Sequence, residues 1–161
     1  MKKSNIGLIC VIAVIVIIAI MMISGYNGMV SKKENVESAL SDLDVMLQRR
    51  ADLIPNLVNT VKGYTSHENE IVNKVIEART KLVNASSIEE KSNANDELTN
   101  SLNSLMVVAE NYPDLKASQN FIQLSDELAG TENRIAVARK DYNNVAKVFN
   151  TTIKKFPNNL L

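Results

Sequence analysis

The side chains that could do chemistry are few in this chain and poorly spaced for it. His67 is the only histidine, so no histidine-based metal cluster can form within one chain. Asp42 and Asp44 form an i, i+2 pair, as do Glu68 and Glu70, and such pairs do not face each other on a helix. The sequence contains no G-x-S-x-G, P-loop or G-x-G-x-x-G motif. We therefore predict no catalytic residue, no cofactor and no metal site.

Three tyrosines could form an aromatic binding site, but a structural role explains them better. Tyr64, Tyr112 and Tyr142 lie near predicted helix ends or on an apolar helix face, where aromatic residues commonly pack. We interpret them as core or bundle-end residues, and the aromatic binding site remains the alternative.

One pair of charges is predicted to meet inside the fold. Arg50 interrupts the apolar face of a first long helix, and Glu132 interrupts that of the last one. Counted from Asn27 and from Lys155, where these helices are expected to meet a membrane surface, both charges stand about 35 Å above it. Because a buried charge needs a partner, we predict an Arg50–Glu132 ion pair that fixes helix register. In the alternative, Arg50 bends out to solvent along its aliphatic stem.

The N-terminal stretch of the chain is the reason to expect a membrane. The 18 residues Ile6–Ile23 are apolar apart from Gly7. As a helix they measure about 27 Å, close to the hydrocarbon thickness of a bilayer. In lipid only a helix or a closed barrel satisfies the backbone, so we predict a transmembrane helix over residues 6–25 behind a short basic tail, residues 1–5.

A cleaved signal peptide is the alternative for this stretch. The apolar run is longer than the about 7–15 residues usual in signal peptides, and no A-x-A-like site follows, so a retained signal-anchor is favoured. Lys2 and Lys3 flank the span directly, whereas Lys32 and Lys33 follow it at a distance. This predicts a cytoplasmic N-terminus and an extracytoplasmic domain in the cell membrane.

Apolar spacing predicts four long helices after the span. The first continues from the span without a break, bends at Pro55 rather than ending there, and stops at Gly63. Capping boxes are predicted at residues 65–68 and 87–90. The other predicted boundaries are a helix end at residues 84–86, a stop at Tyr112–Asp114, a cap at Ser118 and an end at Pro157.

Composition agrees with a helical domain. Beyond residue 25 the chain has 16 Lys and Arg against 18 Asp and Glu, which argues against a nucleic-acid surface. Five Gly, three Pro and no Trp are few for a loop-rich or all-β domain. The predicted fold is all-α: the transmembrane helix continues into an antiparallel up-down helical bundle of about four long helices, similar to a coiled coil.

Several stretches resemble the LemA family, in one order from Tyr26 to Pro157. They are YNGMV at residues 26–30, QRRADLIPNLV at 48–58, VKGY at 61–64, ENYPDLKA at 110–117 and TENRIA at 131–136. The residues singled out in this resemblance are Tyr26, Asn27, Arg50, Pro55, Asn56, His67, Glu68, Tyr112, Pro113, Glu132, Arg139, Tyr142 and Asn143.

The resemblance implies a bacterial, membrane-anchored helical bundle over residues 26–157 whose biochemical role is poorly defined. Some family members look like lipoproteins, which supports the extracytoplasmic placement, and one is a magnetosome-membrane protein. Members often continue past the Phe156-Pro157 motif, so residues 158–161 are interpreted as a C-terminal end shortened relative to the family.

From these features we expect a non-enzymatic membrane-anchored scaffold or adaptor of the bacterial cell envelope. The alternatives are a self-assembling, membrane-shaping protein and an enzyme with an unrecognised site. The expected partners are the lipid bilayer, through a single span, and other envelope proteins. A homo-oligomer is a further expectation, and nucleic acid is not an expected partner.

Overall fold

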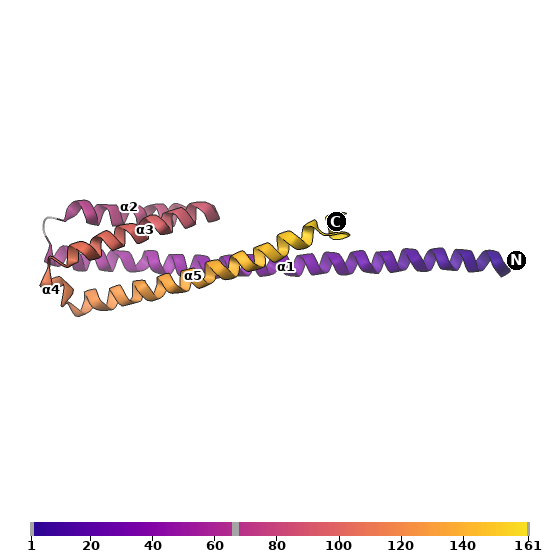
Figure 1. Ribbon diagram of the computed structural model, residues 1–161, viewed down its shortest axis with the longest axis horizontal. Helices are drawn as coiled ribbons and strands as arrows, with labels where there is room; N and C mark the ends of the chain where they lie inside the picture. Colours follow the sequence, from indigo (N-terminus) through magenta and orange to yellow (C-terminus); the bar gives the residue numbers. More distant parts are fainter. Residues whose placement is uncertain (1, 66–67, 161) are drawn as a thin grey trace. The chain divides into compact units, whose positions relative to one another are not determined.

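The computed structural model describes residues 2–65 and 68–160, with side chains from residue 7 onward, and these residues form helices without a strand. The elements are α1 (Lys2–Tyr64), α2 (Asn69–Asn84), α3 (Ile88–Ala109), α4 (Pro113–Lys116), α5 (Gln119–Lys154) and the 3-10 turn η1 (Asn158–Leu160) (Figure 1). The predicted all-α class is confirmed, whereas α4 and η1 were not predicted. Both are short turns next to a proline, which presets the backbone for a helical first turn.

The chain divides into two compact units. The first, which we call the bundle unit, is Asp42–Ala138. The second, the two-helix unit, combines the residues up to Ser41 with those from Arg139 onward.

The bundle unit has one apolar core to which α1, α2, α3 and α5 all contribute. Its fully buried members recur every three or four residues, as helix geometry requires of one face. Burying each Leu or Ile side chain stabilises the fold by about 1.5–3 kcal/mol. The buried apolar residues are Leu43, Leu47, Ala51, Ile54, Leu57, Val58, Val61, Val72, Val75, Ala78, Leu82, Ala94, Leu98, Leu102, Leu105, Ala109, Leu115, Phe121, Leu128 and Ile135.

Helix α1 continues through Pro55 and ends at Tyr64, one residue beyond the predicted stop at Gly63. Proline has no amide hydrogen, so the carbonyl of Ala51 loses its usual partner four residues later. In this fold the Nε of Arg79, in α2, donates to that carbonyl at 2.8 Å. The Ala51 carbonyl, which Pro55 leaves without its helical partner, thus accepts a hydrogen bond that links α1 to α2.

The predicted capping box at the start of α3 is confirmed. The backbone N of Glu90 donates to the Ser87 hydroxyl, and the backbone N of Ser87 donates to the Glu90 carboxylate, each at 3.1 Å. The backbone N of Ser86 donates to the same carboxylate at 2.8 Å. These hydrogen bonds hold the pKa of Glu90 below its ordinary value, and the bond from the backbone N of Ser86 has the largest effect.

The capping box predicted at residues 65–68 is wrong. The Thr65 hydroxyl donates to the carbonyl of Val61 at 3.2 Å, so it serves the end of α1 instead of the start of α2. Glu68 is the N-cap residue of α2 without a side-chain cap, because its carboxylate is bonded to Tyr112 of another segment. A long-range contact therefore outweighs the local pattern here.

The two-helix unit packs less tightly. Half-buried positions on α1 begin at Gly25 and recur at three- to four-residue spacing, and a matching stripe follows α5 beyond Arg139. We call these two sets the facing stripes. They comprise Gly25, Gly28, Met29, Lys32, Val36, Ala39 and Leu40 on α1, and Tyr142, Val145, Ala146, Phe149, Thr152 and Ile153 on α5.

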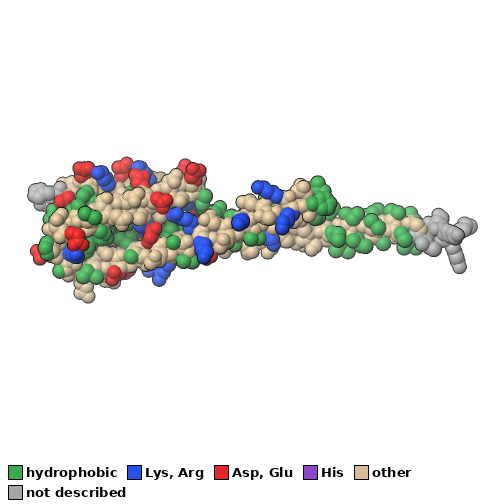
Figure 2. All heavy atoms as spheres, viewed as in Figure 1, with side chains coloured by type: hydrophobic (Ala, Val, Ile, Leu, Met, Phe, Trp, Pro, Cys, Tyr) green, Lys and Arg blue, Asp and Glu red, His purple; other side chains and the backbone are tan. Residues whose placement is uncertain are grey.

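The N-terminal part of α1 has no covering neighbour among the described residues. Every side chain from Gly7 to Ser24 is exposed, and nearly all are apolar (Figure 2). By length and composition, α1 is the one helix in the described part of the chain that could cross a membrane. Exposed apolar side chains on all faces of a helix are suited to lipid rather than to water.

Candidate functional site

A buried polar cluster joins three helices in the bundle unit. Arg50 in α1 is 3% exposed, and Asn95 in α3 is fully buried. The guanidinium Nη1 of Arg50 donates to Oδ1 of Asn95 and forms an ion pair with the carboxylate of Glu132 in α5. The structure therefore places the two charges expected to pair in direct contact, and it adds an amide that the sequence analysis missed.

The two charged groups of this cluster differ in their exposure to solvent. The side chain of Glu132 is 38% exposed, whereas the guanidinium it contacts lies almost wholly inside the core. A charge in the core is costly unless it is paired and hydrogen-bonded, so Glu132 and Asn95 together offset the desolvation of Arg50. Asn95 lies beside Ala94 on the apolar face of α3, but a single Asn at such a position is not by itself a sequence signal for burial.

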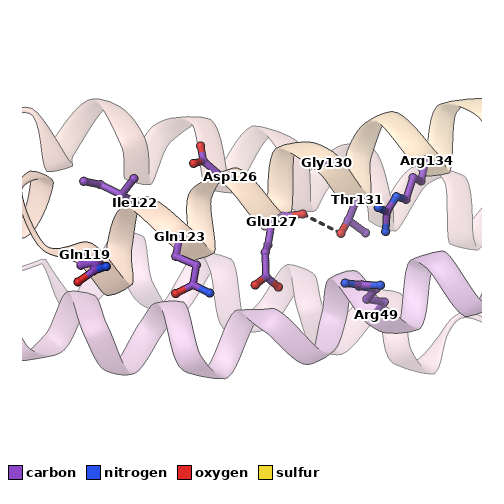
Figure 3. A pocket seen from close by; sticks show the side chains of 9 residues that line it. All are labelled: Arg49, Gln119, Ile122, Gln123, Asp126, Glu127, Gly130, Thr131 and Arg134. Carbon is purple, nitrogen blue, oxygen red and sulfur yellow. Dashed lines mark hydrogen bonds between the residues drawn. The ribbon is translucent and has the colours of Figure 1, made fainter.

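An open groove lies beside this cluster between α1 and α5. Its volume is about 730 Å³, and it is lined by Arg49 from α1 and by Gln119, Ile122, Gln123, Asp126, Glu127, Gly130, Thr131 and Arg134 from α5. In Figure 3, Gln123 and Glu127 extend toward α1, while Asp126 extends the opposite way. The Thr131 hydroxyl donates to the backbone carbonyl of Glu127 at 2.8 Å (dashed line in Figure 3).

The side chains that line the groove are mostly charged or amide groups. Of the lining residues only Thr131 carries a hydroxyl, and that hydroxyl donates to the backbone of its own helix. The two carboxylates of the groove, Asp126 and Glu127, do not converge. Among the described residues no group of three or more His, Cys, Asp or Glu side chains is placed to hold a metal ion.

The carboxylate pairs noted in the sequence are split between separate partners. Asp44 accepts two hydrogen bonds from Nζ of Lys91 in α3, at 2.7 and 2.8 Å. Glu70 pairs with Lys74 one turn along α2 at 2.7 Å, which lowers the pKa of Glu70. Neither contact resembles a pair of catalytic carboxylates.

A second contact joins two residues of the family-like motifs. The Tyr112 hydroxyl donates to Oε1 of Glu68 at 2.9 Å. This hydrogen bond, more than burial, raises the pKa of Tyr112, since an ionised phenol could not donate to a carboxylate. The contact is fully present below the unfolded pKa of tyrosine and is lost as the pH rises through the folded value. It ties the residue before α2 to the residue before α4.

The structure does not gather the remaining motif residues into one site. Tyr26 and Asn27 are exposed on α1 and belong to the two-helix unit, as do half-buried Arg139 and Tyr142 and exposed Asn143 on α5. Pro55 and Asn56 are exposed on α1, and Pro113 is the first residue of α4. His67 lies outside the described residues. Of the three tyrosines, Tyr64 is exposed, and Tyr112 and Tyr142 are half-buried.

The family can now be stated from comparison with known proteins. The model of the LemA family matches residues 39–161, about three quarters of the chain. The chain belongs to the LemA family. The matched region contains the Arg50–Glu132 and Glu68–Tyr112 contacts, and α1 before residue 39 lies outside it.

The sequence identity to individual relatives is modest. The chain is 31% identical to Protein LemA of Metamycoplasma hominis over 81% of this chain and 60% of that protein. It is 29% identical to magnetosome protein MamQ 2 of Paramagnetospirillum magneticum, over 95% of this chain and 65% of the relative. Magnetosome protein MamQ of Magnetospirillum gryphiswaldense is 25% identical over 98% of this chain. The chain thus spans less than two thirds of the length of the first two relatives.

The apolar stretch of α1 and the family membership together indicate a membrane-associated member of the LemA family. None of the names of these relatives states an enzymatic activity.

Proposed function

We propose that this protein is a non-enzymatic, membrane-anchored scaffold of the bacterial cell envelope that presents its bundle unit to partner proteins. The observation that carries this proposal is the continuity of α1. One helix supplies the lipid-suited stretch from Gly7 and, without a break, the core residues Leu43 to Val61 of the bundle unit. Anchor and presented unit therefore share one element.

Charge supports a protein partner for the bundle unit. Residues 42–138 contain nine Lys and Arg against fifteen Asp and Glu, a net charge of −6. Such a surface repels anionic lipid and attracts basic surfaces. We propose that the partners bind through basic patches, and that the groove lined by Arg49 and Arg134 receives an acidic or amide side chain from them.

The proposed location is the cell membrane, with the N-terminus in the cytoplasm and the bundle unit outside. Lys2 and Lys3 directly precede the apolar stretch, and positive charge next to a span favours the cytoplasmic side. The C-terminal end of the chain would then also lie outside.

Site-specific photo-crosslinking in native membranes tests the scaffold proposal. A photo-reactive amino acid replaces Ile122, which lies in the groove, or Val107, which is exposed on α3 outside it. We expect discrete crosslinked species from position 122, weakened by high salt and absent from position 107. Identical products from both positions, or none from either, would contradict the proposal.

The composition of these products separates the scaffold from its alternative. Products that contain another envelope protein, identified by mass spectrometry, support the scaffold. Products made only of two copies of this chain favour the self-assembling, membrane-shaping alternative. Accumulation of a modified small molecule on incubation with the purified protein, lost on mutation of the groove, would instead indicate an enzyme.

A further inference from the structure

The two-helix unit has a sharp boundary on α1. All side chains from Gly7 to Ser24 are exposed, and the half-buried stripe of α1 starts directly afterwards, at Gly25. In Figure 1 the last turns of α5 run antiparallel to α1, and this end of α5 and the N-terminal half of α1 belong to one compact unit. The last turns of α5 and η1 therefore reach the level at which the lipid-suited stretch begins.

Two large apolar side chains at that level point away from the protein. Phe156, just after the end of α5, is 79% exposed, and Leu160, the last residue of η1, is 71% exposed. The backbone here is held in place: the backbone N of Leu160 donates to the Pro157 carbonyl at 3.0 Å, and the Asn158 side chain donates to the Thr152 carbonyl at 3.2 Å. Folded backbone thus presents both side chains to the surroundings.

The charge of this unit has the opposite sign to that of the bundle unit. On the C-terminal side of the apolar stretch, residues 24–41 and 139–161 of this unit contain seven Lys and Arg against three Asp and Glu, a net charge of +4. Lys154 and Lys155 directly precede Phe156, and Lys154 is exposed in the last turn of α5. On the face drawn in Figure 2, Lys and Arg side chains gather beside the C-terminal end of α5.

We propose that residues 154–160 form a second membrane contact, in which Phe156 and Leu160 enter the interface of an anionic bilayer and Lys154 and Lys155 bind its headgroups. Apolar side chains next to a basic cluster are the combination that binds anionic lipid surfaces. The segment belongs to the same compact unit as the apolar stretch of α1, so the bilayer is the nearest apolar phase for it. This contact holds the C-terminal end of α5 at the membrane surface.

The proposal relies on the membrane span of α1 but not on the scaffold role, and the experiment separates the two. The natural chain contains no Trp, so one introduced Trp is a unique fluorescent probe. Phe156→Trp is the test variant. Val107→Trp, at a position 70% exposed in the bundle unit, is the matched water-exposed control. Ile15→Trp, within the apolar stretch, reports on the span itself.

Each full-length variant is placed in lipid nanodiscs that contain brominated lipid, with either anionic or zwitterionic headgroups. We expect the emission of Phe156→Trp to move to shorter wavelength and to be quenched in anionic nanodiscs, while Val107→Trp stays unquenched. In zwitterionic nanodiscs, and in a Lys154→Glu/Lys155→Glu background, quenching of Phe156→Trp should fall at least twofold. High salt should have the same effect.

Three results would overturn the proposal. Quenching of Phe156→Trp no greater than that of Val107→Trp, while Ile15→Trp is quenched, removes the membrane contact but keeps the anchor. Equal quenching of Phe156→Trp in both lipids removes the headgroup binding. If Ile15→Trp is itself unquenched, the span fails, and with it both this contact and the anchored scaffold. Circular dichroism of each variant checks that it keeps its helices.

Discussion

At the residue scale, one buried guanidinium links three helices of the bundle unit. The contact between Arg50 and Glu132 could be anticipated from sequence, because both residues interrupt apolar faces and stand at equal heights by residue counting. Asn95 could not be anticipated in the same way, since a single Asn beside an apolar face is common in solvated helices. Its role follows only from the packing of α3 against α1.

The first prediction concerns the unequal exposure of this pair. Glu132→Ala leaves the buried guanidinium without its carboxylate, so it should lower the free energy of unfolding by about 2–3 kcal/mol. Arg50→Met removes the charge but keeps the aliphatic stem, and should cost less than about 1.5 kcal/mol. Chemical denaturation measures both.

The double variant supplies the control for that comparison. Arg50→Met combined with Glu132→Ala should lose less stability than the sum of the single losses, because the partners act as a unit. Additive losses, or a greater cost for Arg50→Met than for Glu132→Ala, would show that the ion pair does not organise the core.

At the element scale, helix existence and the buried faces were predictable from apolar spacing, and the helix ends were predictable only where caps are local. Ser87 and Glu90 lie three residues apart and bond to each other, so the capping box at α3 was found. The box expected at residues 65–68 failed because Glu68 is bonded to Tyr112, 44 residues away. A local sequence pattern cannot reveal a hydrogen-bond partner that is so distant in the chain. The expected bend at Pro55 stays a prediction.

The second prediction tests the hydrogen bond that Pro55 makes available. Arg79→Met removes the bond to the Ala51 carbonyl and should cost about 1 kcal/mol in the free energy of unfolding. In a Pro55→Ala background the same change should cost less, because the amide of the new residue can bond to that carbonyl. Equal costs in the two backgrounds would show that Pro55 and Arg79 are independent.

The third prediction is a pH dependence at the start of α3. The pKa of Glu90 is lower in the folded protein than its ordinary value, so its contribution to stability is present above the unfolded pKa. That contribution is lost as the pH falls through the folded pKa. Glu90→Gln keeps the geometry of the capping box without the charge.

Thermal unfolding from neutral to acidic pH compares the two proteins. The wild type should be the more stable at neutral pH, and the difference should vanish in acid. A difference that stays constant over the whole range would mean that the carboxylate charge of Glu90 contributes nothing.

At the scale of the whole molecule, charge and hydropathy divide the chain by role. The apolar stretch of α1 suits lipid, residues 24–41 and 139–161 of the same unit carry a net charge of +4, and the bundle unit carries −6. The apolar stretch was evident from sequence alone. The basic grouping was not, because its members come from residues 24–41 and 139–161 and are united only by the fold.

The central claim is that α1 anchors the bundle unit and that this unit lies on the outer side of the cell membrane. The most direct measurement of this claim uses the single cysteine of the chain. Cys10 lies within the apolar stretch, and Val107→Cys in a Cys10→Ser background places a thiol on the exposed face of α3. A membrane-impermeant maleimide is added to intact bacterial cells and to lysed ones. We predict that the cysteine at position 107 is labelled in intact cells, and that Cys10 of the natural chain resists labelling until detergent dissolves the membrane. Labelling at position 107 only after lysis, or of Cys10 without detergent, would contradict the account.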